Sequence, residues 1–302
     1  MSLSINTPLL ESLTLSQLTG SQVWLKMEAM QPGGSFKTRG VGYTCEQHFA
    51  RGARRFVSSS GGNAGLAVAY AGRKLGVPVT VVVPETTSAR ARYLLGLQGA
   101  EVRVYGTSWA EANERALSLL NRDDAFIHPF DDPLLWEGHA TMIDEVVAAG
   151  LRPDGVVLAV GGGGLLAGVD VGLRRHGLDI PIYAVETEGM ASFHAALQAG
   201  ERVSLAELSG VATTLGARQV CDRAFRLAAE REIISLTVSD KQAIDACLRF
   251  LDDHRTLVEP ACGAALAALY QQKIDASRLD NLLVIVCGGS TTTIETLQSY
   301  RR

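Results

Sequence analysis

The chain has 302 residues and a formal net charge of −4; 47% of the residues are hydrophobic and 20% are charged. An apolar fraction of this size is typical of folded proteins, so the composition excludes a disordered chain. The slight negative charge and the lack of a dense basic block exclude broad electrostatic binding to nucleic acid or to an anionic membrane surface. The length predicts about two domains of about 150 residues each.

The cysteines are widely spaced and odd in number, without a Cys-x-x-Cys pair, so we expect no disulfide framework. They are Cys45, Cys221, Cys247, Cys262 and Cys287. No stretch reaches the 18 apolar residues of a membrane span. Residues 1–20 lack the basic and apolar regions of a secretory signal peptide. These features predict a cytoplasmic protein.

Short runs rich in β-branched residues alternate with amphipathic segments along the chain. The predicted strands are 23–28, 55–59, 79–84, 101–105, 125–128, 156–160, 182–186 and 282–287, and the predicted helices between them include 66–75, 109–120, 134–149 and 241–253. Several of these strands are apolar on both faces, as expected for strands buried between helical layers. The alternation predicts an α/β fold with mostly parallel sheets, in which ligands bind at the carboxyl ends of the strands. No linker divides the chain, so we expect its two domains to be interleaved.

The first glycine-rich segment, residues 58–65 (SSSGGNAG), lies between a predicted strand and a predicted helix. Glycines and hydroxyl groups at a helix N-terminus leave several backbone N–H groups free for a carboxylate or a phosphate. The segment is equally consistent with a tight turn in which Ser60 or Asn63 caps the helix. Both interpretations stay open from the residues alone.

Two further glycine-rich segments also follow predicted strands. Residues 161–164 are four consecutive glycines, which cost roughly 0.5–1 kcal/mol each relative to alanine in regular structure. A plain turn needs one or two, so four predict backbone that wraps closely around a ligand, most often a phosphate. In the third segment, residues 287–293 (CGGSTTT), Cys287 either faces a ligand or fills the core, and Ser290 is a candidate cap for the last helix.

Lys37 follows the turn Gly33-Gly34-Ser35-Phe36 and begins a predicted helix. Taken alone, it is consistent with an exposed surface lysine. In a desolvated pocket, however, its amine would lose its charge more easily and become a nucleophile toward carbonyl groups.

Taken together, these segments resemble the pyridoxal-phosphate enzymes of fold type II, whose fold is similar to the tryptophan synthase β-subunit. Within them, the chain resembles the L-serine/L-threonine dehydratases, and the liver-type serine dehydratases in particular. The resemblance runs through nearly the whole chain. It rests on the ordered set 31–37 (QPGGSFK), 129–133 (PFDDP), 136–140 (WEGHA), 185–187 (VET), 192–196 (SFHAA) and 258–265 (VEPACGAA).

The resemblance implies a role for each candidate residue. Lys37 would form the Schiff base with pyridoxal phosphate and act as the general base. The cofactor phosphate would lie on Gly161, Gly162, Gly163, Gly164 and Leu165, the ring hydroxyl on Asn63, one ring face on Phe36, and the ring nitrogen beside Cys287. Ser60, Gly61 and Asn63 would hold the substrate carboxylate.

By the same resemblance, we expect a homodimer that eliminates water and ammonia from L-serine and L-threonine. Residues 1–34 and 134–302 would form a large cofactor-binding domain, and residues 35–133 a smaller domain that carries the substrate loop. A monovalent cation such as K⁺ is implied at Glu186 and at the backbone carbonyls of Leu215 and Ala217. An ordinary structural ion pair is an equal alternative for Glu186.

Two positions depart from the liver-type pattern, which has alanine at both. They are Gly61, in the carboxylate loop, and Thr214, against the second ring face. Both bear on the choice between serine and threonine more than on the cofactor.

Four other interpretations compete with elimination. The same cofactor could serve β-replacement or racemisation. Gly162-x-Gly164-x-x-Ala167, followed by Glu186, fits the fingerprint of a nicotinamide-dependent oxidoreductase, but it leaves Lys37 unexplained. A non-enzymatic amino-acid-binding module does not need that lysine either. The scattered histidines give no zinc spacing, and the sequence has no Gly-x-Ser-x-Gly nucleophile elbow.

Overall fold

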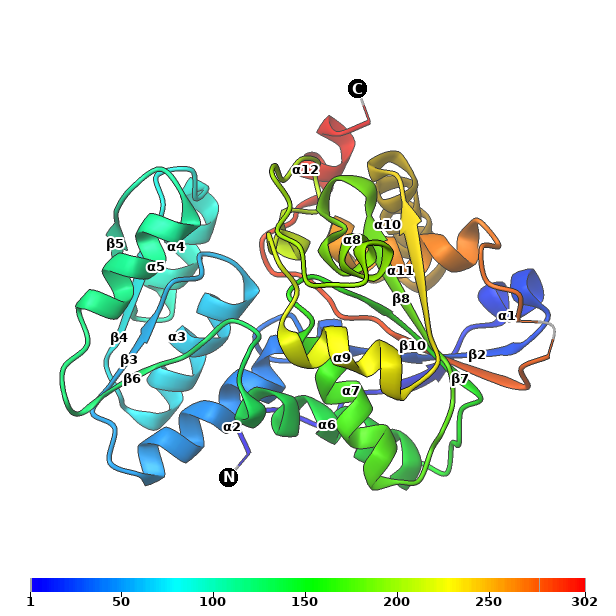
Figure 1. Ribbon diagram of the computed structural model, residues 1–302, viewed down its shortest axis with the longest axis horizontal. Coiled ribbons are helices and arrows are strands. Elements are labelled where there is room, and N and C mark those ends of the chain that lie inside the picture. The colour runs from blue at the N-terminus through cyan, green and yellow to red at the C-terminus, as the bar shows by residue number, and fades with distance from the viewer. Residues whose placement is uncertain (1, 277, 302) are drawn as a thin grey trace.

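Ten strands form two separate sheets in the computed structural model, which describes residues 2–276 and 278–301 (Figure 1). The large sheet has the order β1-β2-β10-β7-β8-β9, and the small sheet has the order β5-β4-β3-β6. All pairs are parallel except β1 with β2. The large-sheet strands are β1 (Leu9–Glu11), β2 (Gln22–Lys26), β7 (Gly155–Ala159), β8 (Ile182–Thr187), β9 (Ile233–Val238) and β10 (Asn281–Ile285). The small-sheet strands are β3 (Arg55–Ser58), β4 (Val79–Val83), β5 (Glu101–Val104) and β6 (Asp124–Phe126).

Helices cover both sheets, and their ends follow local sequence signals. Ser108 and Ser239 each begin a helix with a capping box, and Pro133 and Pro260 each occupy a first helical turn, where proline is tolerated. The helices are α1 (Leu13–Thr19), α2 (Lys37–Ala50), α3 (Asn63–Leu75), α4 (Ala89–Leu97), α5 (Trp109–Ser118), α6 (Pro133–Ala148), α7 (Gly164–Arg175), α8 (Ser192–Ala199), α9 (Asp222–Glu230), α10 (Asp240–His254), α11 (Pro260–Tyr270) and α12 (Ile294–Ser299).

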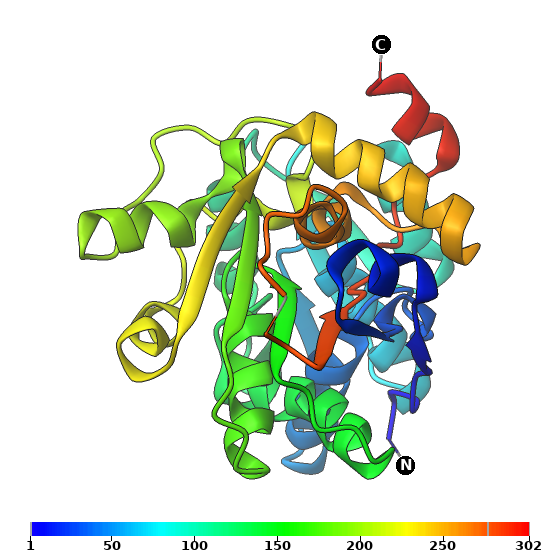
Figure 2. The ribbon, with the colours of Figure 1, turned by 90° about the vertical axis from the view of Figure 1, so that its right-hand side faces the viewer.

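The large sheet lies between two helical layers, with α10 and α11 above it and α6 and α7 below it in the view of Figure 2. Every residue of α11 is buried, because this helix packs between the sheet and α10. The helix α2 contacts both α3, beside the small sheet, and α6, below the large one. Its first residue, Lys37, therefore stands where the two halves of the molecule meet.

The predicted α/β architecture with two mostly parallel sheets is confirmed. Each of the eight predicted strands is present, with ends that differ by two residues at most, and the helix predicted at 66–75 begins earlier, at Asn63. The prediction missed β1 and β9, which are edge strands of the large sheet. Five of the six residues of β9 are only partly buried, so its sequence lacks the strong apolar signal of the inner strands.

All strands of the small sheet come from residues 55–126, within the segment predicted as the smaller domain. The domain boundaries at 34/35 and 133/134 stay a prediction. Across the described chain, no helix is both long and apolar enough to cross a membrane. All five cysteines are buried and unpaired.

Candidate active site

The candidate residues gather at the carboxyl ends of strands from both sheets. The turn before Lys37 follows β2, the four glycines follow β7, Cys287 follows β10, and Asn63 follows β3. The turn and the Cys287 segment bind each other directly, because Phe36 N donates to Cys287 O at 3.1 Å. Parallel strands end at a common edge of a sheet, so segments far apart in the sequence meet here.

Lys37 is the first residue of α2, and its side chain is only partly exposed. Its Nζ donates to the carbonyl of Pro129 at 2.5 Å and lies 5.0 Å from the centroid of the Phe36 ring. Burial lowers the pKa of Lys37 to about 8, although the negative charge of the nearby Glu259 opposes this shift. The interpretation of Lys37 as an exposed surface lysine is therefore wrong, and its amine has the lowered pKa that nucleophilic catalysis needs.

A buried histidine supports the Phe36 ring. The His139 ring lies 4.9 Å from the Phe36 ring, centroid to centroid, at an angle of 53°. Gly40 makes room for this imidazole, since a Cβ at Gly40 would lie 2.5 Å from His139 Cε1. The Gly40 N–H donates to His139 Nδ1 at 3.2 Å. Burial lowers the pKa of His139 well below its usual value, so the ring is neutral behind Phe36.

The carboxamide of Asn63 bridges the two halves of the molecule. Its Nδ2 donates to Glu259 Oε1 at 2.7 Å, and its Oδ1 accepts from Ser290 N at 2.9 Å. The expectation that Ser60 or Asn63 caps the helix is wrong: Gly62 is the N-cap of α3, without a side-chain bond. Ser60 Oγ instead accepts from Gly62 N at 3.3 Å, inside the loop.

Ser290 likewise does not cap the last helix, as its sequence position suggested. Its Oγ donates to the carbonyl of Gly33, and Thr293 caps α12 by accepting from Thr296 N at 3.1 Å. The segment after β10 is thus fastened to the turn that precedes Lys37.

The four consecutive glycines each meet a steric demand. Gly163 has φ +95°, a backbone conformation that favours glycine, and a Cβ at Gly162 would lie 2.3 Å from Phe130 Cγ. A Cβ at Gly161 would lie 3.0 Å from Leu215 Cα, and one at Gly164 would lie 2.6 Å from Phe130 O.

The backbone N–H groups of this loop are free to bind a ligand. Those of residues 161–165 have no acceptor within the described parts of the chain, and they stand at the N-terminus of α7. Such a group of N–H donors at a helix N-terminus fits a phosphate.

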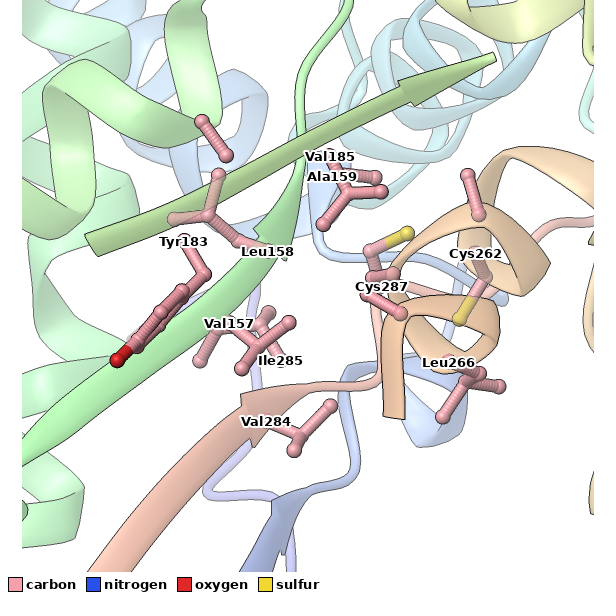
Figure 3. Close-up of a cluster of buried hydrophobic side chains, with 14 of the residues drawn as sticks. Val157, Leu158, Ala159, Tyr183, Val185, Cys262, Leu266, Val284, Ile285 and Cys287 are labelled. Carbon is pink, nitrogen blue, oxygen red and sulfur yellow. The ribbon is translucent and has the colours of Figure 1, made fainter. Parts of the chain in front are cut away.

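Cys287 is nearly inaccessible, at 5% exposure, and lies beside Cys262 of α11, as Figure 3 shows. A hydrogen bond with Cys262 and burial both raise the pKa of Cys287 well above its usual value. The thiol is therefore protonated and uncharged. Of the two interpretations from sequence, the core position is observed, and the buried thiol also lies near the Lys37 amine.

Glu186 is fully buried at the end of β8 and accepts from the backbone N–H groups of Phe193 at 2.9 Å and His194 at 2.7 Å. Burial raises the pKa of Glu186 to about 8. Within residues 2–276 and 278–301 it forms no ion pair, so the structural ion-pair interpretation is wrong. Leu215 packs on Gly161, and its carbonyl accepts from Ala217 N at 2.7 Å.

Sequence reasoning assigned no role to Glu259, although the residue faces Lys37 and binds Asn63. A signal was present: Glu259 is the one charged residue in the stretch 256–270, otherwise apolar apart from Thr256. The structure also shows no cluster of three or more His, Cys, Asp or Glu side chains able to hold a metal ion, among the residues it describes.

A lysine with a lowered pKa opposite a phosphate-type loop, between two parallel sheets, defines a class of enzymes that carry an aldehyde cofactor on a lysine. Residues 2–288 match the family described as "Pyridoxal-phosphate dependent enzyme", so the chain belongs to that family. The resemblance read from the sequence is confirmed. The nicotinamide-dependent and non-enzymatic alternatives are wrong.

Individual relatives are similar over nearly their whole length. A mouse protein named "Serine dehydratase-like" is 50% identical over 306 residues, which cover 98% of this chain and 93% of the relative. A mouse "L-serine dehydratase/L-threonine deaminase" is 46% identical, with 99% and 95% covered. The crystal structure of a fungal L-serine ammonia-lyase from Rhizomucor miehei superposes with a TM-score of 0.94 at 36% identity, covering 100% of this chain and 99% of that one.

Proposed function

We propose that the chain is a pyridoxal-phosphate-dependent ammonia-lyase that converts L-serine to pyruvate and L-threonine to 2-oxobutyrate, each with release of ammonia. The observation that carries the proposal is the Lys37 amine, with its pKa lowered to about 8, in a chain whose residues 2–288 match the family. The names of the similar mouse and fungal proteins support this choice of reaction.

The residues present fit the cofactor. The free N–H groups of residues 161–165 would hold its phosphate, Lys37 its aldehyde carbon, Phe36 one face of its ring, and Asn63 its ring hydroxyl. When bound, pyridoxal phosphate supplies an electron sink for negative charge at the substrate α-carbon. The neutral thiol of Cys287 is a weak partner for the ring nitrogen, and this suits an elimination in which that charge is consumed at once.

This chain's own groups then have distinct tasks. The loop of Ser60, Gly61 and Asn63 would orient the substrate carboxylate with backbone N–H groups at the start of α3. The neutral Lys37 Nζ would take the proton from the α-carbon, and the β-hydroxyl would leave as water when it receives a proton in turn, so that the α-proton and the hydroxide balance as one water molecule. Burial makes about a tenth of this amine neutral at pH 7, a far larger share than in an exposed lysine.

A Lys37→Ala variant tests the reaction and the role of the lysine together. We expect the absorbance near ~410–420 nm, typical of pyridoxal phosphate on a lysine, to disappear along with pyruvate formation. Lys241→Ala is the matched control, because the Lys241 side chain is 84% exposed and forms an ion pair with Asp245 of its own helix. A Lys37→Ala variant that still forms pyruvate from L-serine would overturn the proposal.

Product analysis separates the remaining reactions of the same cofactor. Pyruvate and 2-oxobutyrate report elimination, D-serine reports racemisation, and sulfide incorporated from O-acetylserine reports β-replacement. An added Cβ at Gly61 would lie 2.7 Å from Thr87 Cγ2, so alanine there would force Thr87 or the proposed carboxylate loop to shift. We expect Gly61→Ala to change the ratio of serine to threonine turnover.

We further propose that K⁺ binds at Glu186 with the carbonyls of Leu215 and Ala217. Two observations support a cation: the fully buried carboxyl has no ion pair in the described chain, and the buried hydroxyl of Ser192 lacks a hydrogen-bond partner there. Without a cation, the raised pKa of about 8 makes the free energy of unfolding fall as pH rises from about 4.5 toward 8. K⁺ should therefore raise Tm more than tetramethylammonium does above pH 8, and equal effects of K⁺ on wild type and Glu186→Gln would contradict the site.

The proposal includes a cytoplasmic location, which the unpaired, buried cysteines support. It also includes a homodimer, which the family resemblance supports. Light scattering on the purified chain measures its mass, and a monomer would exclude the dimer.

A further inference from the structure

Glu259 is a nearly inaccessible acid that the proposed reaction leaves without a task. It is 4% exposed and precedes α11, at the N-cap position. Its Oε1 accepts two hydrogen bonds of 2.7 Å, from Asn63 Nδ2 and from Thr214 Oγ1. Its buried Oε2 has no hydrogen-bond partner within the described chain. Burying a carboxylate costs free energy of folding unless the group is paired or hydrogen-bonded.

The bond between Glu259 and Asn63 joins the two halves of the molecule. Asn63 begins α3, beside the small sheet, whereas Glu259 precedes α11, which packs on the large sheet. Ser290, which follows β10 of the large sheet, donates to the other end of the carboxamide. The large-sheet side thus holds both the oxygen and the nitrogen of the Asn63 side chain.

These two contacts fix which way the carboxamide faces. An amide carries two N–H donors on Nδ2 and one acceptor oxygen. With Glu259 on one N–H and Ser290 N on the oxygen, a single Nδ2 hydrogen is left. The flipped amide would set its oxygen against the carboxylate and its N–H against the Ser290 N–H, so both contacts would become repulsive.

We propose that Glu259 is a positioning residue: it orients the Asn63 carboxamide so that the remaining Nδ2 hydrogen is presented to the ring hydroxyl of pyridoxal phosphate. This inference rests on the proposed cofactor and adds a residue that acts through Asn63. It also makes the Asn63–Glu259 bond a link that closes the small sheet onto the large one.

The surroundings of Glu259 are shaped for a carboxyl group. A Cβ at Gly289, which has φ +143°, would lie 2.4 Å from Glu259 Cδ, so only glycine leaves room for this side chain. The titratable groups that face it are Lys37 of α2 and the thiols of Cys247 and Cys287.

Opposing effects set the pKa of Glu259. Burial raises the pKa of Glu259 to about 7, while the bonds from Thr214 and Asn63 and the Lys37 charge lower it. The charge assistance that the carboxylate gives to Asn63 is therefore lost as pH falls through about 7.

A double-mutant cycle on cofactor binding tests the inference. Glu259→Ala, Asn63→Ala and the double variant are prepared without cofactor, and their Kd for pyridoxal phosphate is measured by absorbance titration. Loss of a charge-assisted bond predicts about 10- to 100-fold weaker binding for each single variant. If Glu259 acts through Asn63, the double variant binds within about twofold of Asn63→Ala. Multiplication of the two single effects would overturn the inference.

Glu259→Gln repeats the cycle with an isosteric side chain, in case the alanine variant does not fold. Gln keeps an acceptor oxygen but loses the charge, so we expect about 3- to 10-fold weaker binding in wild type and no change in the Asn63→Ala background. Glu137→Gln, which removes a half-exposed carboxylate elsewhere, is the control and should leave Kd unchanged.

Two further readouts separate positioning from a purely structural role. Glu259→Gln should shift the pH midpoint of the bound cofactor's absorbance change, and this shift should vanish in the Asn63→Ala background. Without cofactor, Glu259→Gln should speed amide hydrogen exchange in residues 60–66, where the link between the sheets is lost. A spectral shift of equal size in both backgrounds would contradict the role of Asn63.

A failure of the proposed reaction and a failure of this inference can be told apart by experiment. A wild-type chain that binds pyridoxal phosphate at Lys37 but forms no pyruvate overturns the reaction, and the cycle still decides the role of Glu259. A multiplicative cycle in a chain that does form pyruvate overturns only the role of Glu259. A wild-type chain with no affinity for pyridoxal phosphate overturns both.

Discussion

The lowered pKa of Lys37 leads to a quantitative prediction about its reactivity toward aldehydes. With a pKa of about 8, about a tenth of the Lys37 amine is neutral at pH 7. For a lysine in a model peptide, with a pKa of about 10.4, the neutral share at pH 7 is about 0.04%. Only the neutral amine attacks a carbonyl, so Lys37 should react about 200-fold faster than the peptide at this pH.

The assay is the rate of Schiff-base formation between the cofactor-free chain and pyridoxal, trapped with borohydride and located by peptide mapping. Because burial disfavours the ammonium form, the rate should rise with pH and level off above about 8. Acetyl-lysine amide measured in parallel should keep rising to about pH 10. A Lys37 midpoint near 10 would refute the reasoning, because it would mean that the amine is solvated like that of an exposed lysine.

Two further substitutions test how the site is built. Gly162→Ala should destabilise the fold by about 1–3 kcal/mol and weaken cofactor binding, because its Cβ would lie 2.3 Å from Phe130 Cγ; urea unfolding measures the loss, and Phe130→Ala in the same chain should recover part of it. Glu28→Gln should lower the free energy of unfolding by about 3–5 kcal/mol, since the fully buried Glu28 accepts from Arg39 Nε at 2.7 Å. Glu137→Gln removes a half-exposed ion pair and should change the free energy of unfolding by about 1 kcal/mol or less. Equal losses of free energy in Glu28→Gln and Glu137→Gln would contradict the role of burial.

The inner strands of both sheets could be predicted from sequence because their residues are apolar on both faces. In β4, for example, all five residues are buried, and the run of valines signals this directly. The edge strand β9 could not be predicted, because its partly exposed residues carry no such signal. Topology sets which strands become edges, and the local sequence does not encode it.

The residues of the site likewise include some that could be predicted from sequence and some that could not. Lys37 and the glycines at 161–164 could be singled out because their chemistry and local cost are visible in the sequence. The role of Glu259 could not, since it depends on Asn63, which is 196 residues away in the sequence and lies in a helix beside the other sheet. The helix caps assigned to Ser60 and Ser290 were wrong for a related reason: these hydroxyl groups bind loop backbone that the local sequence does not reveal.

The position of β10 has a consequence for how the protein is made on the ribosome. β10 is synthesised after the other five strands of the large sheet, yet it lies in the middle of that sheet, paired with β2 on one side and β7 on the other. Until residues 281–285 emerge, β2 and β7 each expose an unpaired edge, which is a template for pairing with other chains. The small sheet can be complete as soon as residues 55–126 have emerged. A nascent chain therefore carries a finished small sheet beside an open large one, and Lys37 meets its Cys287 neighbour only after residue 287 has been synthesised.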